Sequence, residues 1–242
     1  MPPTEQTLRD AAAPIGVIGD VHQDLHALRL TLDGPLREAA TKITTGDFLD
    51  RGPAAPLDTI AHLRAANVQL VAGNHELAYL GGPAFEGMRE HRDTDLRHLL
   101  RAMVIDGELV AARAAGPVLC VHAGVTRRFW DEQLRASCGA DVDLIAATLN
   151  RWFLRAVLRG DFRHPVFAAL DSGERGPFWA DLDRDLLRPG APPFAQAVGH
   201  TRVDAPGDWL QSGDGRVFPL DWRRTPGDPI GHLVVEDPPD AQ

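Results

Sequence analysis

Residues 14–22 read PIGVIGDVH, a short apolar run that ends in a glycine followed by an aspartate and a histidine. An apolar run of this length, closed by a Gly-Asp turn, is typical of a buried strand. Similar runs occupy 42–46 and 68–72, and leucines recur at helical spacing in the segments between the runs. The alternation of strand and helix predicts right-handed crossovers and a largely parallel sheet, hence an α/β fold.

The remainder of the chain continues this alternation less regularly. Helices are predicted from Asp93 or Thr94 to Met103 and over 142–158, and the Gly- and Pro-rich segment 159–193 is predicted to be a loop. Further strands are predicted at 117–121, 194–198, 216–221 and 231–236. We expect the last two strands to pair as a C-terminal hairpin. No linker divides the chain, so 1–242 is predicted to be one domain.

Composition excludes several classes of function. The 242 residues carry a formal net charge of -9, which disfavours binding to long nucleic acids. Lys42 is the only lysine, and no P-loop is present. Two cysteines, the absence of a membrane-length apolar run and a polar N-terminus predict a cytoplasmic protein without a membrane partner. An anionic substrate must then be held by arginines or metal ions, and the ten histidines favour metals.

Polar motifs follow five of the predicted strands. They are Gly19-Asp20-Val21-His22, GDFLDRG at 46–52, GNHE at 73–76, HAG at 122–124 and GHT at 199–201. Functional groups of such folds gather where the strands end. Asp20 and His22 alternate along extended chain and so can reach one ion from the same face, while the two carboxylate oxygens of Asp47 can bridge two ions.

Three further side chains complete a set of oxygen and nitrogen ligands. Asn74 offers an amide oxygen, and His122 and His200 offer imidazole nitrogens. The whole set would hold two divalent cations and leave positions open for a bridging hydroxide and for substrate oxygens. Ligands of this kind without thiolate suit transition metals better than calcium or magnesium. We expect manganese, with iron, zinc or nickel as alternatives.

In these motifs the chain resembles the calcineurin-like metallophosphoesterases, and the match extends from Gly19 to Thr201. The DRG and NHE strings are similar to those of the phosphoprotein-phosphatase branch and its bacterial relatives, which include diadenosine tetraphosphate hydrolases. The resemblance implies a four-layer α/β/β/α sandwich with a small helical cap, which we expect in 127–193. It also implies a hydrolase that cleaves phosphate monoesters of phosphoproteins or small molecules by direct attack of a metal-bridging hydroxide.

The resemblance further implies a role for each motif residue. The first metal would be held by Asp20, His22 and Asp47, and the second by Asp47, Asn74, His122 and His200. His75 matches the general acid of the family, Asp50 the carboxylate that orients it, and Arg51 the phosphate clamp. An imidazolium kept charged by a carboxylate suits protonation of a poor leaving group.

The chain departs from the family pattern at two places. Gln23 stands where the first motif usually has glycine, and Asp181 stands where related bacterial phosphatases often have a second phosphate-binding arginine. Candidates to replace that arginine are Arg127, Arg128, Arg175 and Arg184. Two alternatives to a monoesterase stay open: a hydrolase of dinucleoside polyphosphates or other phosphodiesters, and a binding module without catalysis. The expected partner is therefore a phosphorylated small molecule, a nucleotide or a phosphoprotein.

Overall fold

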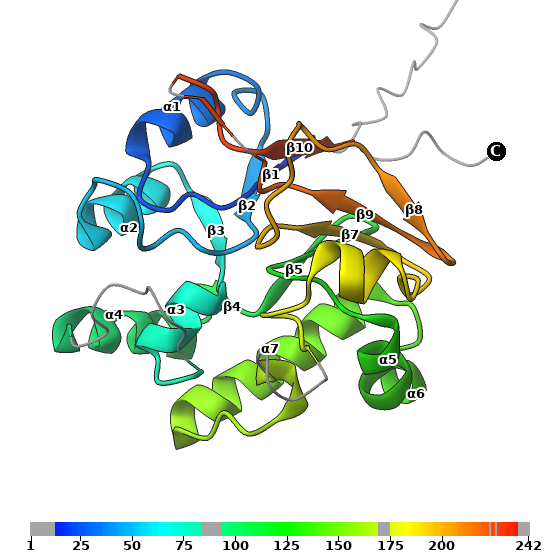
Figure 1. Cartoon of the computed structure of the whole chain (residues 1–242). Coiled ribbons are helices and arrows are strands. Elements are labelled where there is room, and N and C mark those ends of the chain that lie inside the picture. Colours follow the sequence, from blue (N-terminus) through cyan, green and yellow to red (C-terminus); the bar gives the residue numbers. More distant parts are fainter. Residues whose placement is uncertain (1–12, 84–92, 169–174, 223, 226, 237–242) are drawn as a thin grey trace, which may run out of the picture.

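The first of two five-stranded sheets contains the strands predicted in the first half of the chain (Figure 1). The computed structural model describes residues 13–83, 93–168, 175–222, 224–225 and 227–236. The sheet has the order β10-β1-β2-β3-β4, with β1 Ile15–Ile18, β2 Thr41–Thr44, β3 Val68–Val71, β4 Leu109–Val110 and β10 His232–Val235. Strands β1, β2 and β3 are parallel, as predicted. The short strand β4, which was not predicted, is parallel to β3, and β10 is antiparallel to β1.

The second sheet has the order β5-β6-β7-β9-β8. Its strands are β5 Ala112–Ala115, β6 Val118–Val121, β7 Ala195–Val198, β8 Leu210–Ser212 and β9 Gly215–Pro219. Strands β6, β7 and β9 are parallel, and β5 and β8 are antiparallel edge strands. The carboxyl ends of β6 and β7 therefore lie at one edge of this sheet, as those of β1, β2 and β3 do in the first.

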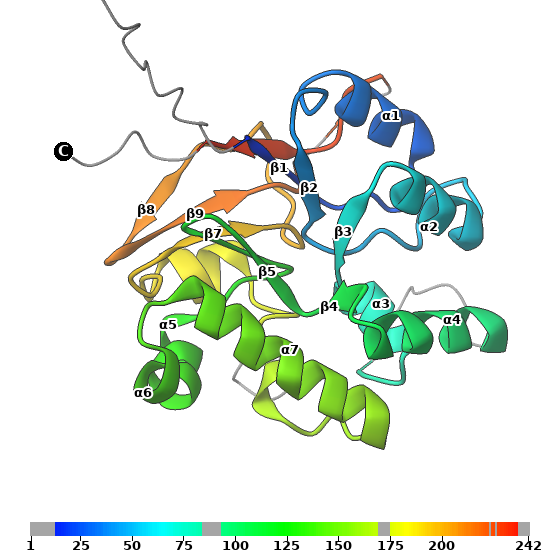
Figure 2. The ribbon, with the colours of Figure 1, turned by 180° about the vertical axis from the view of Figure 1, so that it is seen from behind.

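Helices cover the outer faces of both sheets (Figures 1 and 2). The α-helices are α1 Leu25–Asp33, α2 Pro56–Ala65, α3 Asn74–Tyr79, α4 Thr94–Ile105, α5 Arg127–Phe129, α6 Arg135–Cys138 and α7 Val142–Arg159; single turns of other helix types are η1 Trp130–Leu134, η2 Pro165–Phe167 and η4 Leu182–Leu187. Helices α1 and α2 lie beside the first sheet, and α7 packs on β5 and β6. Asp24 caps α1, and Gly34 follows its last residue.

The core has two parts because each sheet is buried on both faces. A cluster that includes Val17 and Ile43 of the first sheet and Cys120 and Phe218 of the second packs the sheets against each other. The larger cluster joins the outer faces to the helices. This layering confirms the predicted α/β/β/α sandwich. Among the described helices, none combines the length and hydropathy of a transmembrane span.

The predicted C-terminal hairpin is wrong, because β9 and β10 lie in different sheets. The chain leaves the second sheet after β9, and the Ile230 amide then donates to Thr31 Oγ1 on α1 at 2.7 Å. The Gly231 carbonyl next accepts from the Gly19 amide at 2.7 Å, which brings β10 alongside β1. An apolar run predicts a strand but does not specify its partner. The sequence also gave no signal for β4, β5 and β8, which are two to four residues long.

The segment 127–193, predicted as a cap, divides into two parts in space. Its helix α7 packs on the second sheet, so this part belongs to the outer helical layer. The region 159–193, predicted as loop, contains the helical turns η2 and η4. Residues near η4 approach the strand ends, where the ring centroids of Trp179 and His200 are 6.0 Å apart.

We expect Phe153→Ala to lower the free energy of unfolding by about 3–5 kcal/mol, because it empties a ring from the layer between α7 and the second sheet. Phe153 is 1% exposed, and its ring lies 5.8 Å from that of Phe178. Leu158→Ala, on the exposed side of the same helix (49%), is the control and should change stability by less than about 1 kcal/mol. Urea denaturation measures both. Equal losses would contradict this packing of α7.

Candidate metal centre

The six predicted ligands converge at one edge of the sandwich. Each lies just beyond the carboxyl end of a strand: Asp20 and His22 after β1, Asp47 after β2, Asn74 after β3, His122 after β6 and His200 after β7. Four of the side chains therefore come from the first sheet and two from the second. All are buried except His200, which is half-buried.

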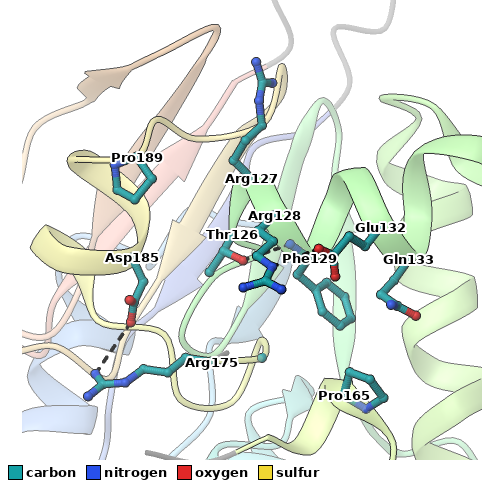
Figure 3. A pocket seen from close by; sticks show the side chains of 11 residues that line it. Thr126, Arg127, Arg128, Phe129, Glu132, Gln133, Pro165, Arg175, Asp185 and Pro189 are labelled. Carbon is teal, nitrogen blue, oxygen red and sulfur yellow. Dashed lines mark hydrogen bonds and ion pairs between the residues drawn. The ribbon is translucent and has the colours of Figure 1, made fainter. Parts of the chain in front are cut away.

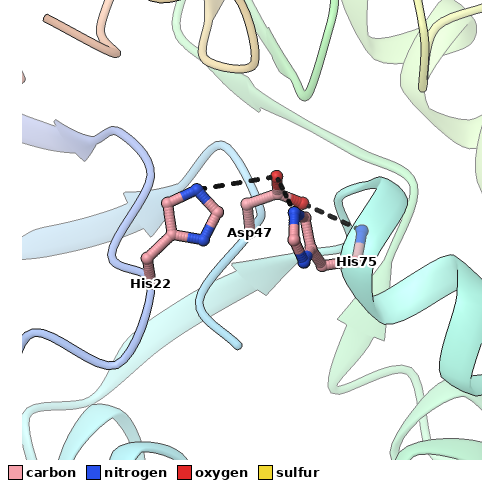
Figure 4. Close-up of side chains that lie close together, drawn as sticks. All are labelled: His22, Asp47 and His75. Carbon is pink, nitrogen blue, oxygen red and sulfur yellow. Dashed lines mark hydrogen bonds and ion pairs between the residues drawn. The ribbon is translucent and has the colours of Figure 1, made fainter. Parts of the chain in front are cut away.

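Asp47 lies between His22 and His75 (Figure 4). Its Oδ2 is 4.0 Å from His22 Nε2, and its Oδ1 is 3.5 Å from His122 Nε2. One set of possible ligand atoms, within 4.8 Å of one another, comes from His22, Asp47 and His75, and a second such set comes from Asp47, His122 and His200. Asp47 is common to both sets, which is the arrangement that a bridging carboxylate requires.

Hydrogen bonds outside the centre orient two of the imidazoles. His22 Nδ1 donates to the Leu49 carbonyl at 3.1 Å, and His122 Nδ1 donates to the Thr45 carbonyl at 3.0 Å. In a neutral ring this leaves the Nε2 lone pair facing inward, as in metal-bound histidines. His122 Nε2 then lies 2.8 Å from Asn74 Oδ1, so two acceptor atoms face each other. A cation between such atoms would satisfy both, and this donor set therefore fits a metal ion.

The three histidines among the predicted ligands, His22, His122 and His200, are neutral near pH 7. Burial, together with the charges of His75 and Arg51, lowers the pKa of His22 to about 3. Burial and neighbouring positive charges likewise lower the pKa of His200 to about 4, and the pKa of His122 is also lowered. Burial has the opposite effect on Asp47 and raises its pKa to about 8. Neutral imidazoles bind metal ions without first losing a proton, whereas Asp47 would exchange its proton for a metal.

The backbone that carries these side chains is strained. Seven non-glycine residues of the described chain have φ between 46° and 68°, and six of them are in these loops: His22, Gln23, Asp47, Asp50, Arg51 and His200. Such conformations persist only where the surrounding structure holds them. One such restraint comes from Gln23, whose side-chain amide donates a hydrogen bond to the Ala54 carbonyl and so holds the loop. Gly73 and Gly199 let the backbone pass close to the carboxylates of Asp47 and Asp20, because a Cβ at either position would overlap these side chains.

His75 and Asp50 form the predicted pair. His75 Nδ1 lies 2.8 Å from Asp50 Oδ2, and His75 Nε2 faces Asp47 Oδ2 at 3.6 Å. Burial alone would raise the pKa of Asp50, but the hydrogen bonds from His75 and Tyr79 outweigh it and lower that pKa. The Asp50 carboxylate is therefore charged where it meets the imidazole. Arg51 lies on the exposed side, with Nη1 3.2 Å from His22 Nε2.

Sequence reasoning missed three buried residues of the centre. Glu76, which is 0% exposed, accepts hydrogen bonds from the backbone amides of Asp47, Leu49 and Gly73. Tyr79 donates to Asp50 Oδ1 at 2.8 Å. Asp221 follows β9, and its charge adds to burial in raising the pKa of Asp20. The position of Asp221 after a predicted strand is a signal that could have identified it.

Of the four candidate arginines, only Arg175 is largely buried. Its side chain is 12% exposed, against 56% for that of Arg184, and its positive charge lowers the pKa of His200. Arg127 and Arg128 are ion-paired at 2.6 Å with Asp214 and at 2.8 Å with Glu132. Figure 3 shows Arg175 at the wall of a cavity of about 210 Å³. The cavity is also lined by Thr126, Arg128, Phe129, Pro165 and Pro189.

Comparison with known proteins identifies one family. The sequence profile of the calcineurin-like phosphoesterases matches residues 13–201. No curated protein matches the chain. Among solved structures, a metallophosphoesterase from Sphaerobacter thermophilus is 17% identical with a TM-score of 0.48, and the alignment covers 93% of this chain and 83% of that one.

Two other solved structures also align with most of the chain. A putative diadenosine tetraphosphatase is 16% identical with a TM-score of 0.47, and the alignment covers 95% of this chain and 96% of that one. A predicted phosphoesterase from Streptococcus pneumoniae is 12% identical with a TM-score of 0.32, at coverages of 93% and 84%.

Stability of the metal-free protein should fall as pH rises from about 6.5 to about 8. Burial raises the pKa of Asp47 and of Glu76 to about 8, so in this range the folded chain holds more protons than the unfolded chain. The histidines with lowered pKa are neutral in both states above their ordinary value of 6.5 and do not contribute. Since metal ions replace those protons, Mn²⁺ should raise Tm more at about pH 8 than at about pH 6.5.

Thermal unfolding with and without Mn²⁺ measures this effect. Asp47→Asn should abolish the increase in Tm that Mn²⁺ causes, because the shared carboxylate is lost. Asp183→Asn removes an exposed carboxylate on η4 and should keep the increase. An equal response of both variants to Mn²⁺ would contradict a metal centre built around Asp47.

Proposed function

This chain belongs to the calcineurin-like phosphoesterase family and is a hydrolase, and we propose that it hydrolyses phosphate monoesters of phosphoproteins or small molecules. The convergence of six ligand-type side chains at the strand ends, with Asp47 shared by two clusters, is the observation that carries this proposal. Hydrolysis of a phosphate ester needs positive charge at the phosphate and a group that protonates the leaving oxygen. Metal ions held by the predicted ligands would provide the first and His75 the second. Two free cysteines in the described chain support a reducing compartment, and we propose the cytoplasm.

Two divalent ions would be held by this chain. Asp20, His22 and Asp47 would bind the first, and Asp47, Asn74, His122 and His200 the second. The mixture of imidazole nitrogens with carboxylate and amide oxygens favours a transition metal, and we propose manganese. When bound, such ions supply positive charge to the phosphate and a water that is acidic enough to act as nucleophile near neutral pH.

The protein itself would supply the acid and the phosphate clamp. His75 would give a proton to the leaving oxygen as its bond to phosphorus breaks, because the charged Asp50 at Nδ1 stabilises a protonated ring. Arg51 stands at the exposed side of the centre, where its guanidinium can bond two phosphate oxygens. Together these groups would complete an in-line displacement without a covalent phosphoenzyme.

We propose that the cavity in Figure 3 holds the organic part of the substrate. Arg175 lines the cavity, and its charge also lowers the pKa of His200 in the centre. Its Nε has no hydrogen-bond partner among the described residues, and its Nη1 is 3.6 Å from Asp185 Oδ2. Phe129, Pro165 and Pro189 give the cavity apolar walls. We propose that Arg175 takes the place of the missing second phosphate-binding arginine. Arg175 would then be the residue through which the predicted cap, on a single domain, contacts the substrate.

The alternative substrate is a dinucleoside polyphosphate, and the arginines around the cavity favour it. Its volume is below the range of about 300–1,000 Å³ common for ligand pockets, which fits one ring or side chain better than a whole nucleoside. The cavity volume therefore favours hydrolysis of a phosphate monoester over hydrolysis of a dinucleoside polyphosphate. Kinetic profiling with a phosphopeptide, diadenosine tetraphosphate and a cyclic nucleotide distinguishes the substrates. A protein that hydrolyses none of them with added Mn²⁺ would be a binding module.

We expect His75→Asn to lower kcat on an alkyl phosphate by about 10²–10⁴-fold and to affect p-nitrophenyl phosphate much less, because only the alkoxide needs a proton to leave. Mn²⁺ binding, measured by calorimetry, should be unchanged. His98→Asn replaces an exposed histidine on α4 and is the control. Equal losses on both esters would refute the general acid, and loss of Mn²⁺ binding would make His75 a ligand.

Replacement of Arg175 should weaken substrate binding. We expect Arg175→Met to raise KM about tenfold or more, with a smaller change in kcat, because a charge-assisted hydrogen bond to the substrate is lost. Arg184→Met is a matched control, since Arg184 also pairs with Asp185 but is mostly exposed. Steady-state kinetics measures both variants. A similar KM in the two would exclude Arg175 from the substrate site.

A further inference from the structure

Tyr79, the only tyrosine of the chain, is buried beside the pair formed by His75 and Asp50. Its hydroxyl donates to Asp50 Oδ1 at 2.8 Å, while Asp50 Oδ2 lies 2.8 Å from His75 Nδ1. The two oxygens of one carboxylate are thus divided between a phenol and an imidazole. With both oxygens engaged, the carboxylate has no freedom to rotate away from the ring.

The fold fixes Tyr79 from two directions. His75 and Tyr79 are four residues apart on α3, so their side chains lie on the same face of this helix. The Tyr79 carbonyl accepts from Arg97 Nε of α4 at 3.0 Å, which ties the end of α3 to a neighbouring helix. The phenol therefore meets Asp50 from a rigid support.

The direction of the Asp50 side chain depends on outside contacts more than that of a carboxylate on unstrained backbone. Its backbone lies in the left-handed region, with φ 64°, and so does that of Arg51, with φ 68°. A side chain on strained backbone keeps its direction only if other groups hold it. Burial and the nearby Asp50 raise the pKa of Tyr79, so the phenol keeps the proton that it donates.

We propose that Tyr79 is a positioning residue that, through Asp50, holds the His75 imidazole in the orientation for proton donation to the leaving oxygen. The inference rests on the proposed function. In the step concerned, the bond between phosphorus and the leaving oxygen breaks, water supplies the oxygen that replaces it, and the proton passes from His75 to the leaving group. Tyr79 neither gains nor loses a proton and touches no reacting atom.

Tyr79→Phe keeps the ring and removes only the hydroxyl. We expect kcat on an alkyl phosphate to fall about tenfold, kcat on p-nitrophenyl phosphate to change less than about twofold, and KM for both to stay the same. In a His75→Asn background the same substitution should have no further effect, because Tyr79 acts through His75. Thr148→Val removes another buried hydroxyl, on α7, and should leave all these values unchanged.

A spectroscopic measurement tests the contact without turnover. Because the chain has one tyrosine, ¹³C labelling at Cζ gives a single NMR signal. Asp50→Asn should shift this signal by replacing a charged acceptor with a neutral one, while Asp183→Asn should leave it in place. An unshifted signal would overturn the inference.

The kinetic outcomes separate this inference from the proposed function. If the wild type hydrolyses p-nitrophenyl and alkyl phosphates and His75→Asn affects mainly the alkyl ester, the proposed acid stands. If Tyr79→Phe then slows both esters equally, or slows the His75→Asn variant further, Tyr79 has only a structural role and the inference fails alone. A wild type that hydrolyses neither ester with Mn²⁺ overturns the proposed function and this inference together.

Discussion

The Glu76 carboxylate is the contact on which the geometry of the centre depends. It accepts three backbone hydrogen bonds of 2.8–2.9 Å, two from the loop after β2 and one from Gly73 after β3. It thereby fixes the spacing between Asp47 and the helix that begins at Asn74. Removing one partner of such a buried group leaves amides without acceptors, at a cost of about 1–3 kcal/mol each. The strained backbone of Asp47 and Asp50 is tolerable because Glu76 holds the amides of Asp47 and Leu49.

Around this contact, the electrostatics favour a cation. Asp20, Asp47, Glu76 and Asp221 are buried close together, and burial raises the pKa of each; repulsion from neighbouring carboxylates adds to this effect for Asp20, Asp47 and Glu76. The facing imidazoles are neutral and so cannot balance these charges. Divalent ions would supply the missing positive charge, which explains how an acidic chain attracts phosphate at one place. The net charge of -9 describes the surface, not the centre.

The strand ends could be predicted from sequence because apolar runs mark buried strands and the carboxyl ends of parallel strands meet. That reasoning placed Asp20, Asp47 and His122 at strand ends, and in the structure they follow β1, β2 and β6. It failed for β9 and β10, whose partners depend on hydrogen bonds such as that between Ile230 and Thr31 across 199 residues. The contacts of Glu76 and Tyr79 likewise reach up to 29 residues along the chain and leave no local pattern. Arg175 differs from the other candidate arginines only in its burial, which no single sequence reports.

The predicted ligands come from both sheets, so the centre forms only after the whole chain has been synthesised and both sheets have packed. Asp20, Asp47 and Asn74 are translated early, but His200 follows β7, late in the second sheet. A nascent chain therefore carries exposed carboxylates and imidazoles without a finished site until both sheets have formed and packed. A metal ion bound by Asp47, His122 and His200 would then link the first sheet to the second. A chain that ends before β7 would lack His200 and with it one of the residues proposed to hold the second metal.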